Sequence, residues 1–314
     1  MKVFITGITG MVGSCFYESF LADGHAVKGL ARSSASSRME AIQDKNVIRG
    51  DISDRDQLES ILRKEKPDLV IHMAAQAFNG MSWDAERFTH MTNYMGTLNL
   101  LQVLHRYLPE TKLLLACSSA EYGFFSPEDC PLKEERPLKP VTPYGVSKAG
   151  IEQLGFQFFA NYGMPVYLPR MFIHVGTGHP PATAIQNFAR QLALIKKGKL
   201  PPVMHVGNLT TARDFIDVRD GVAAMRLVLE KGNPGEPYNI CTGTAWKISE
   251  ILDKLIAISG MEVEVITDPG LLRASDEVLL LGDNSKINAL GFEQKYSIDD
   301  TLEGVFADWM ARAD

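Results

Sequence analysis

Apolar runs alternate with amphipathic stretches through the first half of the chain. The apolar runs are short and rich in Val, Ile and Leu, and they cover residues 2–6, 26–30, 47–52, 68–75, 112–119 and 165–170. The stretches between them, such as 54–66 and 83–107, carry apolar residues at helical spacing. Buried strands that alternate with helices predict right-handed βαβ crossovers and a doubly wound parallel sheet.

The pattern loosens after residue 170. We expect a loop over 172–181 and helices over 182–197, 249–259 and 299–313. The fold class predicted is therefore α/β, with a doubly wound (Rossmann) domain over 1–170, to which some later segments return. A smaller C-terminal α/β domain is expected over 171–314.

Composition narrows the class of protein. The 314 residues include 45% apolar and 22% charged side chains, as in ordinary globular proteins. The net charge of −6 argues against general binding to nucleic acid or anionic membranes. Four cysteines without paired spacing predict a reduced compartment. Since no leader and no membrane-length apolar run is seen, we expect a cytoplasmic protein.

Three glycines follow the first strand and open a helix. Gly7, Gly10 and Gly13 are spaced GxxGxxG rather than in the commoner GxGxxG form. Backbone amides of such a turn approach a pyrophosphate at the positive N-terminus of the helix. The segment 7–13 is therefore a candidate dinucleotide turn, which includes Thr9, Met11 and Val12.

The end of the second strand bears on the cofactor. A carboxylate at this position binds the ribose hydroxyls of NAD, whereas an arginine accommodates the 2′-phosphate of NADP. This chain has Arg32 and no acid from Ala26 to Ala35. We therefore predict NADP(H) in preference to NAD(H), the alternative being that Arg32 is a solvated loop residue. Asp51, after the third strand, is expected to contact the adenine.

A tyrosine and a lysine lie four residues apart after a proline. Pro143 suits the first turn of a helix, and Tyr144 and Lys148 would share one face of it. A neighbouring ammonium favours the phenolate form, so this tyrosine can act as an acid or a base. Ser118 ends an apolar strand, where ligands of parallel sheets bind.

Jointly these features resemble the extended short-chain dehydrogenase/reductases that modify nucleotide-diphosphate sugars. The resemblance also rests on Tyr122-Gly123 and on the segments 212–218 and 238–240. It implies that Ser118 and Tyr144 bond the reacting sugar oxygen, while Lys148 holds the nicotinamide ribose. It also implies cofactor contacts from further residues, namely Ile52, Met73, Ala74, Ala75 and Asn93.

The resemblance implies substrate contacts in both halves of the chain. Arg213 and Arg273 are expected to grip a diphosphate. Further substrate contacts are expected from Gln76, Ser119, Glu121, His174 and Glu277. No metal site is expected. Relatives commonly form homodimers through the helices after Trp83 and at Tyr144, and apolar residues such as Leu98, Leu101, Phe156 and Phe159 permit this.

Within the family the resemblance is strongest to GDP-4-keto-6-deoxy-D-mannose reductases, then to GDP-mannose 4,6-dehydratases. Dehydratases have an acid at the position of Ala120, which cannot take a proton, and Glu121 is expected to point to the other face. Reduction of a GDP-sugar is therefore predicted, with dehydratase, 4-epimerase or a non-catalytic NADP sensor or scaffold as alternatives. Ile173 replaces a substrate-binding asparagine of relatives, which leaves the sugar open.

Overall fold

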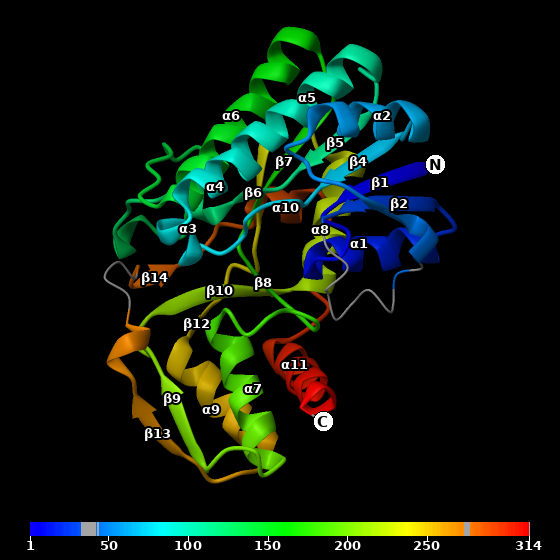
Figure 1. Ribbon diagram of the computed structural model, residues 1–314. Coiled ribbons are helices and arrows are strands. Elements are labelled where there is room, and N and C mark those ends of the chain that lie inside the picture. Colours follow the sequence, from blue (N-terminus) through cyan, green and yellow to red (C-terminus); the bar gives the residue numbers. More distant parts are fainter. Residues whose placement is uncertain (33–41, 43, 273–276, 314) are drawn as a thin grey trace.

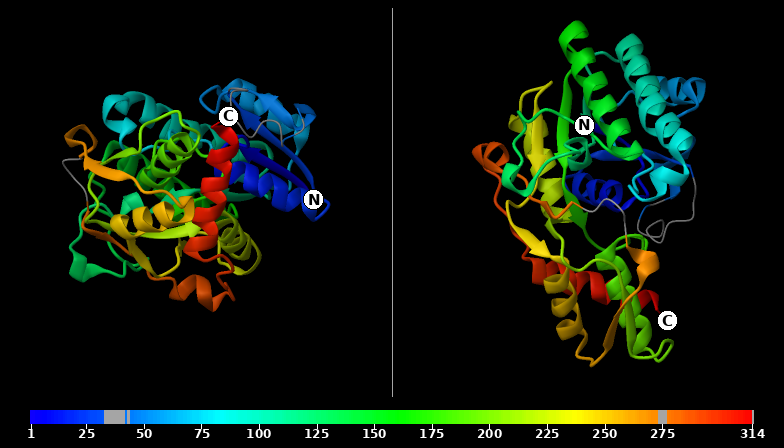
Figure 2. Two further views of the ribbon diagram at one scale, coloured as in Figure 1. Left: turned by 90° about the horizontal axis from the view of Figure 1, so that it is seen from below. Right: turned by 90° about the vertical axis from the view of Figure 1, so that its left-hand side faces the viewer.

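The computed structural model describes residues 1–32, 42, 44–272 and 277–313. Figure 1 shows a larger layered part that carries the N-terminus and a smaller part that carries the C-terminus. The views in Figure 2 show that the chain is elongated along the direction that joins these two parts. Both parts combine helices with strands.

A parallel sheet forms the centre of the larger part. Its order is β11-β7-β5-β4-β1-β2-β3, and β6 pairs with β7. The strands are β1 (Lys2–Thr6), β2 (Ala26–Ala31), β3 (Val47–Arg49), β4 (Leu69–His72), β5 (Lys112–Leu115), β6 (Cys117–Ser118), β7 (Val166–Met171) and β11 (Pro237–Ile240). Every pairing is parallel. The order reverses between β1 and β4, which confirms the doubly wound fold.

Helices cover both faces of this sheet (Figure 1). One face packs against α2 (Arg55–Glu65), α5 (Gly96–Tyr107) and α6 (Pro143–Tyr162). The other packs against α1 (Met11–Ala22), α8 (Val218–Lys231) and α10 (Ser285–Ala289). Because α8, α10 and β11 come from the second half of the sequence, that half contributes directly to the first core.

The smaller part has a separate core between helices and short strands. Its helices are α7 (Ala184–Lys196), α9 (Ile248–Ser259) and α11 (Ile298–Arg312), and its strands are β8 (Ile173–Val175), β9 (Val203–Val206), β10 (Ala212–Asp217), β12 (Ala245–Lys247), β13 (Glu264–Thr267) and β14 (Leu279–Leu280). The loop predicted over 172–181 was therefore wrong in part, because β8 pairs with β10. A three-residue strand is too short to show a period in the sequence.

The single long helix expected over 83–107 is interrupted. Its segments are α3 (Met81–Asp84), α4 (Glu86–His90), the π-helical turn η2 (Met91–Met95) and α5. Asn93 lies in the π-turn, where its side chain bonds both backbone groups of Gln76. Short 3₁₀ turns elsewhere are η1 (Asp44–Asn46), η3 (Ser119–Glu121), η4 (Pro127–Asp129) and η5 (Pro269–Leu271).

Three further expectations concern the cysteines, a membrane-spanning segment and the homodimer. The four cysteines are free thiols. Among the described residues, no helix is both long and apolar enough to cross a membrane. Leu101 is fully buried and Leu98 packs against the same core, so these two are core residues, whereas Phe156 on α6 is exposed. The homodimer stays a prediction.

His72 joins the ends of two strands to a helix through its ring nitrogens. Nδ1 lies 2.7 Å from Oγ1 of Thr6, and Nε2 lies 2.9 Å from Oγ1 of Thr97. Thr97 donates its hydroxyl proton to the carbonyl of Asn93, and Thr6 accepts from the amide of Ala74. This arrangement suits a neutral imidazole. Burial, with a smaller effect of Lys148, lowers the pKa of His72 to about 3.

We predict acid sensitivity from this residue. Between pH 6.5 and about 3 the unfolded imidazole binds a proton that the folded one excludes, so stability falls as pH falls in this window. The loss attributable to His72 is about 2 kcal/mol between pH 7 and pH 5. Urea unfolding at both pH values checks this: His72→Gln, which cannot titrate, should show a smaller loss than wild type. An equal loss would contradict the assignment.

Candidate active site

A cavity of about 1630 Å³ takes lining residues from both parts of the chain. From the larger part come the turns after β1, β2 and β4, the end of β6 and the start of α6. From the smaller part come β8, the start of α7 and residues beside β10 and β14. The cavity therefore lies at the carboxyl ends of the central strands, where ligands of this sheet type bind.

The glycine turn forms one wall and has no room for side chains. Gly7 has φ +71°, and a Cβ there would lie 2.8 Å from the amide nitrogen of Ala74. A Cβ on Gly13 would lie 2.2 Å from the carbonyl oxygen of Gly7. Gly10 is the N-cap of α1 and also lines the cavity. The turn thus presents bare backbone at a helix N-terminus, which fits a dinucleotide pyrophosphate.

The remaining predicted cofactor residues divide into two groups. Those that line the cavity are Thr9, Met11, Val12, Gly13, Arg32, Ile52, Met73, Ala74 and Ala75. Asp51 is not among the lining residues, and its Oδ1 accepts from the backbone amide and hydroxyl of Ser53. Its contact with adenine stays a prediction.

Arg32 lines the cavity and is partly exposed. Its side chain is 47% exposed, and Nη1 is 4.0 Å from Oδ2 of Asp51. The guanidinium carbon lies 5.2 Å from the ring centroid of Phe88. An ion pair this long and this exposed holds the cation only weakly. The guanidinium is therefore available to an incoming anion.

Tyr144 and Lys148 lie on the first two turns of α6. Thr142 caps this helix by accepting the amide of Gly145 at 3.0 Å, and Pro143 is its first residue. Nζ of Lys148 donates to the carbonyl of Ala116 at 2.6 Å and lies 5.8 Å from the ring centroid of Tyr144. The helix start is therefore tied to the strand that leads into Ser118.

Ser118 ends β6 and lines the same cavity as Tyr144 and Lys148. Its Oγ accepts the amide of Ala120 at 3.2 Å. This hydrogen bond uses a lone pair of the oxygen, so the hydroxyl hydrogen of Ser118 can be donated to a ligand. The cavity thus contains two hydroxyl donors and an ammonium that are brought together by separate elements.

Asn93 and Gln76 do not occupy the predicted positions. Asn93 is 1% exposed, Gln76 is 6% exposed, and neither lines the cavity. The amide of Asn93 donates to Oγ of Ser147 at 2.9 Å, and Ser147 donates to the carbonyl of Tyr144 at 2.7 Å. Asn93 therefore supports the helix that bears Tyr144 from behind. Direct ligand contacts from Asn93 and Gln76 do not fit this geometry, because the π-turn directs Asn93 toward Gln76.

Four of the predicted substrate residues line the cavity, namely Ser119, His174, Arg213 and Glu277. Arg213 lies in β10, and its Nη1 donates to the carbonyl of Glu277 at 2.6 Å. Nη2 is 3.5 Å from Oε2 of the same residue. Arg273 lies outside the described residues. Arg213 thus presents to the cavity a guanidinium whose charge is partly neutralised by Glu277.

His174 is a strand residue and not the loop residue expected from the sequence. Its Nδ1 donates to the carbonyl of Phe172 at 2.9 Å, and Nε2 is buried. A Cβ on Gly221 would lie 2.1 Å from Nε2, so the ring packs against α8. Burial lowers the pKa of His174 to about 4. The ring is therefore neutral near pH 7.

Glu121 does not line the cavity, which does not fit the substrate contact predicted for it. Its side chain is fully buried, and Oε1 accepts the amide of Ser118 at 2.6 Å. Ala120, the residue before it, lines the cavity instead. The expectation that Glu121 points away from the ligand face agrees with this geometry. The physical cause is the 3₁₀ turn η3, which turns residue 121 into the protein interior.

Several residues of this region were not singled out from the sequence. Ala77, Phe78, Asn79, Met81 and Trp83 line the cavity after β4. The ring of Phe78 meets that of His179 edge-on at 5.6 Å, which joins the two parts across the cavity. Glu152 and Arg170 form a buried ion pair behind Ser118. A spacing of four from Lys148 to Glu152 on one helix face is the signal that could have indicated the latter.

Comparisons with known proteins agree on one family. The family model described as GDP-mannose 4,6 dehydratase matches residues 4–305. The chain is 31% identical to a GDP-6-deoxy-D-mannose reductase of Pseudomonas aeruginosa over 99% of this chain and 98% of that protein. It is 28% identical to a GDP-mannose 4,6-dehydratase of Vibrio cholerae over 95% and 91% of the two chains.

A solved structure extends this likeness to three dimensions. The structure of RMD from Pseudomonas aeruginosa complexed with NADPH superposes with a TM-score of 0.87 at 30% identity. The match covers 99% of each chain. The match therefore includes the smaller part of this chain in addition to the central sheet.

We predict that Gly13→Ala disrupts the turn, because its Cβ would collide with the backbone of Gly7. The expected result is a loss of dinucleotide affinity and a lower melting temperature. Gly304→Ala is the matched control, since that glycine also lies in a helix and has open space around it. The control should gain up to about 1 kcal/mol of stability. Calorimetry and dinucleotide titration check both variants. Unchanged dinucleotide affinity in Gly13→Ala would contradict pyrophosphate binding at this glycine turn.

Proposed function

This chain belongs to the GDP-mannose 4,6-dehydratase family, and on that premise we propose that it reduces the C4 keto group of a GDP-linked 4-keto-6-deoxyhexose with NADPH. GDP-4-keto-6-deoxy-D-mannose is the proposed substrate. The observation that carries the choice of reductase is the position of Ala120. Ala120 lines the cavity beside Ser118, where an elimination would need a proton acceptor that an alanine cannot supply.

The acids near this position do not replace that base. Glu121 is buried behind the strand end. Among the described lining residues, the acids are Asp84 on α3 and Glu277, which is paired with Arg213. Removal of water across C5 and C6 of a hexose requires a base at C5 and an acid at the leaving hydroxyl. Simple carbonyl reduction requires neither, which supports reduction over dehydration.

The cofactor site fits NADPH. The turn over residues 7–13 would hold the pyrophosphate, Arg32 the 2′-phosphate and Lys148 the nicotinamide ribose. When bound, NADPH supplies the hydride that reduces the carbonyl carbon. Likeness to the NADPH complex of the Pseudomonas aeruginosa protein supports this choice over NADH.

The residues of this chain would provide the proton and the charge stabilisation. Tyr144 donates its phenolic proton to the carbonyl oxygen as that oxygen gains negative charge. Ser118 donates a hydrogen bond to the same oxygen, and its free hydroxyl proton permits this. The ammonium of Lys148, held by the carbonyl of Ala116, stabilises the phenolate that remains. Arg213 is proposed to bind the diphosphate.

The proposal is tested by supplying the purified protein with NADPH and GDP-4-keto-6-deoxy-D-mannose. We expect NADPH oxidation and a product heavier by two hydrogens. Tyr144→Phe should lower kcat by ~10²- to 10⁴-fold, because the general acid is lost, while NADPH binding is retained. Absence of turnover by wild type that binds NADPH would exclude this reaction. Consumption of GDP-mannose with loss of water would instead establish the dehydratase, and inversion at C4 the epimerase.

Cofactor preference gives a separate prediction. Arg32→Ala should raise the KM for NADPH roughly 10- to 100-fold, as expected for loss of a charge-assisted hydrogen bond, and leave that for NADH nearly unchanged. Arg49→Ala is the matched control, because Arg49 is exposed at the end of the neighbouring strand but does not line the cavity. Equal effects of Arg32→Ala on both cofactors would exclude a 2′-phosphate contact.

A further inference from the structure

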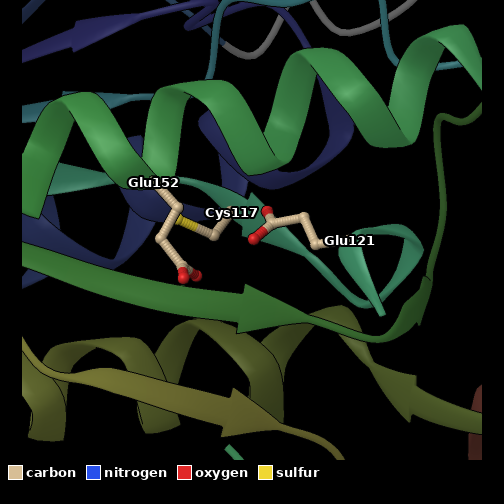
Figure 3. A group of neighbouring side chains, drawn as sticks. All are labelled: Cys117, Glu121 and Glu152. Carbon is tan, nitrogen blue, oxygen red and sulfur yellow. The ribbon is translucent and has the colours of Figure 1, made fainter. Parts of the chain in front are cut away.

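Three buried side chains from separate elements meet behind Ser118. Glu121 follows β6, Glu152 lies on α6 and Arg170 lies on β7. Their exposed fractions are 0%, 4% and 4%. Figure 3 shows Glu121 and Glu152 extending from their two elements toward Cys117. One carboxyl oxygen of each glutamate and the sulfur of Cys117 lie within 4.8 Å of one another.

One oxygen of this cluster has no hydrogen-bond donor. Oε1 of Glu121 accepts from the amide of Ser118, but Oε2 is buried and unpartnered. Arg170 does not fill the gap, because its Nε is 4.0 Å from Oε2. Its Nε and Nη2 donate to Glu152, both at 2.7 Å. Its Nη1 donates to Oη of Tyr122 and to the carbonyl of Glu134.

The charges of the cluster also indicate that one of its acceptors lacks a partner when both carboxylates are ionised. Two ionised carboxylates beside one guanidinium would leave a net negative charge in the interior, with one acceptor unsatisfied. A metal ion is a poor solution, because the guanidinium of Arg170 already provides the cation that Glu152 binds. Burial also raises the pKa of the Cys117 thiol well above its usual value, which disfavours the thiolate that a metal requires.

We propose that Glu121 carries a proton that it shares with Glu152, and that this carboxyl pair positions Ser118 against the helix that bears Tyr144 and Lys148. Protonated Oε2 of Glu121 donates to the Glu152 carboxylate, so every polar atom of the pair has a partner. The positioning role rests on the proposed reductase function, whereas the shared proton does not.

The pair spans the distance between the two catalytic elements. Glu152 lies one turn after Lys148 on α6, and Glu121 bonds the backbone of Ser118. The turn and the helix also touch directly, since a Cβ on Gly145 would lie 2.5 Å from the carbonyl oxygen of Ala120. Ser118 is thus attached to α6 at one side by this close approach and at the other by the carboxyl pair.

The titration of Glu121 supports the geometry. Burial is the main cause, and the nearby Glu152 the second, that raise the pKa of Glu121 well above its usual range. The ionisable groups that surround it from other elements are Cys117, Glu152 and Arg170, with Tyr122 beyond them. Of these only Arg170 favours ionisation, and four of its five N–H donors bond groups other than Glu121.

The first test compares two variants of Glu121. Glu121→Gln keeps an acceptor for Ser118 and supplies an N–H for Glu152. Its kcat should therefore stay within about 3-fold of wild type, a smaller change than the loss of one neutral hydrogen bond would cause. Glu121→Met keeps the length without these bonds, so kcat should fall by about 10-fold or more with the KM for NADPH unchanged. Exposed Glu135→Gln is the control and should match wild type. Equal kcat for the Gln and Met variants would overturn the positioning role.

Two further readouts need no substrate. Wild type at pH 7 should show the infrared carbonyl band of a protonated carboxyl, and Glu121→Gln should lack it. In proton–nitrogen NMR the amide of Ser118 should lie downfield in wild type and Glu121→Gln, and move upfield in Glu121→Met. Absence of the infrared band in wild type would overturn the shared proton, whether or not the protein is a reductase.

The shared proton also predicts how the stability of the protein changes with pH. An unfolded glutamic acid loses its proton near pH 4.5, while the folded Glu121 keeps it, so wild type loses stability as pH rises above that value. Glu121→Gln lacks this loss. Its stability relative to wild type should therefore increase from pH 4.5 to pH 8 in urea unfolding. Parallel pH profiles for the two proteins would contradict the proposal.

Discussion

The buried ion pair between Arg170 and Glu152 is the contact on which the site depends. It joins β7 to α6 with two hydrogen bonds of 2.7 Å, in a region that water does not reach. A buried pair of this kind adds little net stability over an apolar contact, but removing one partner leaves an unpaired charge and costs about 3–5 kcal/mol. Its main effect is therefore to permit only one position of α6 on the sheet.

Other contacts extend that constraint across the site. Arg170 also bonds Tyr122, whose hydroxyl donates to Asn239 on β11, so the edge of the sheet and the turn after β6 are held together. On the opposite side, Asn93 reaches α6 through Ser147. Tyr144 thus lies on a helix fixed from both sides. The proposed proton transfer from Tyr144 requires its hydroxyl to be positioned to within a fraction of an ångström, and support from both sides of the helix favours that accuracy.

The cavity itself results from the order of the strands. Crossovers run in opposite directions from β1 and β4, so the loops after these strands separate and leave a crevice. Gly7 and Ala74 approach each other there without side chains between them. The smaller part then closes the crevice with β8 and α7. Because α8 and β11 return to the central sheet, this part cannot move away as an independent body without breaking the first core.

Local spacing was enough to determine the strands of the central sheet up to β7, the glycine turn and the pairing of Tyr144 with Lys148, because each depends on residues a few positions apart. The doubly wound order also followed, since alternating strands and helices leave few topologies open. Tertiary contacts alone decided the rest. Asn93 faces Gln76 through a π-turn, β8 exists only by pairing with residues 42 positions later in the chain, and Glu121 is turned inward toward Glu152 and Arg170. The residues that set these positions lie far apart in the chain, so their burial and charge balance come into being only when the sheet and α6 are packed.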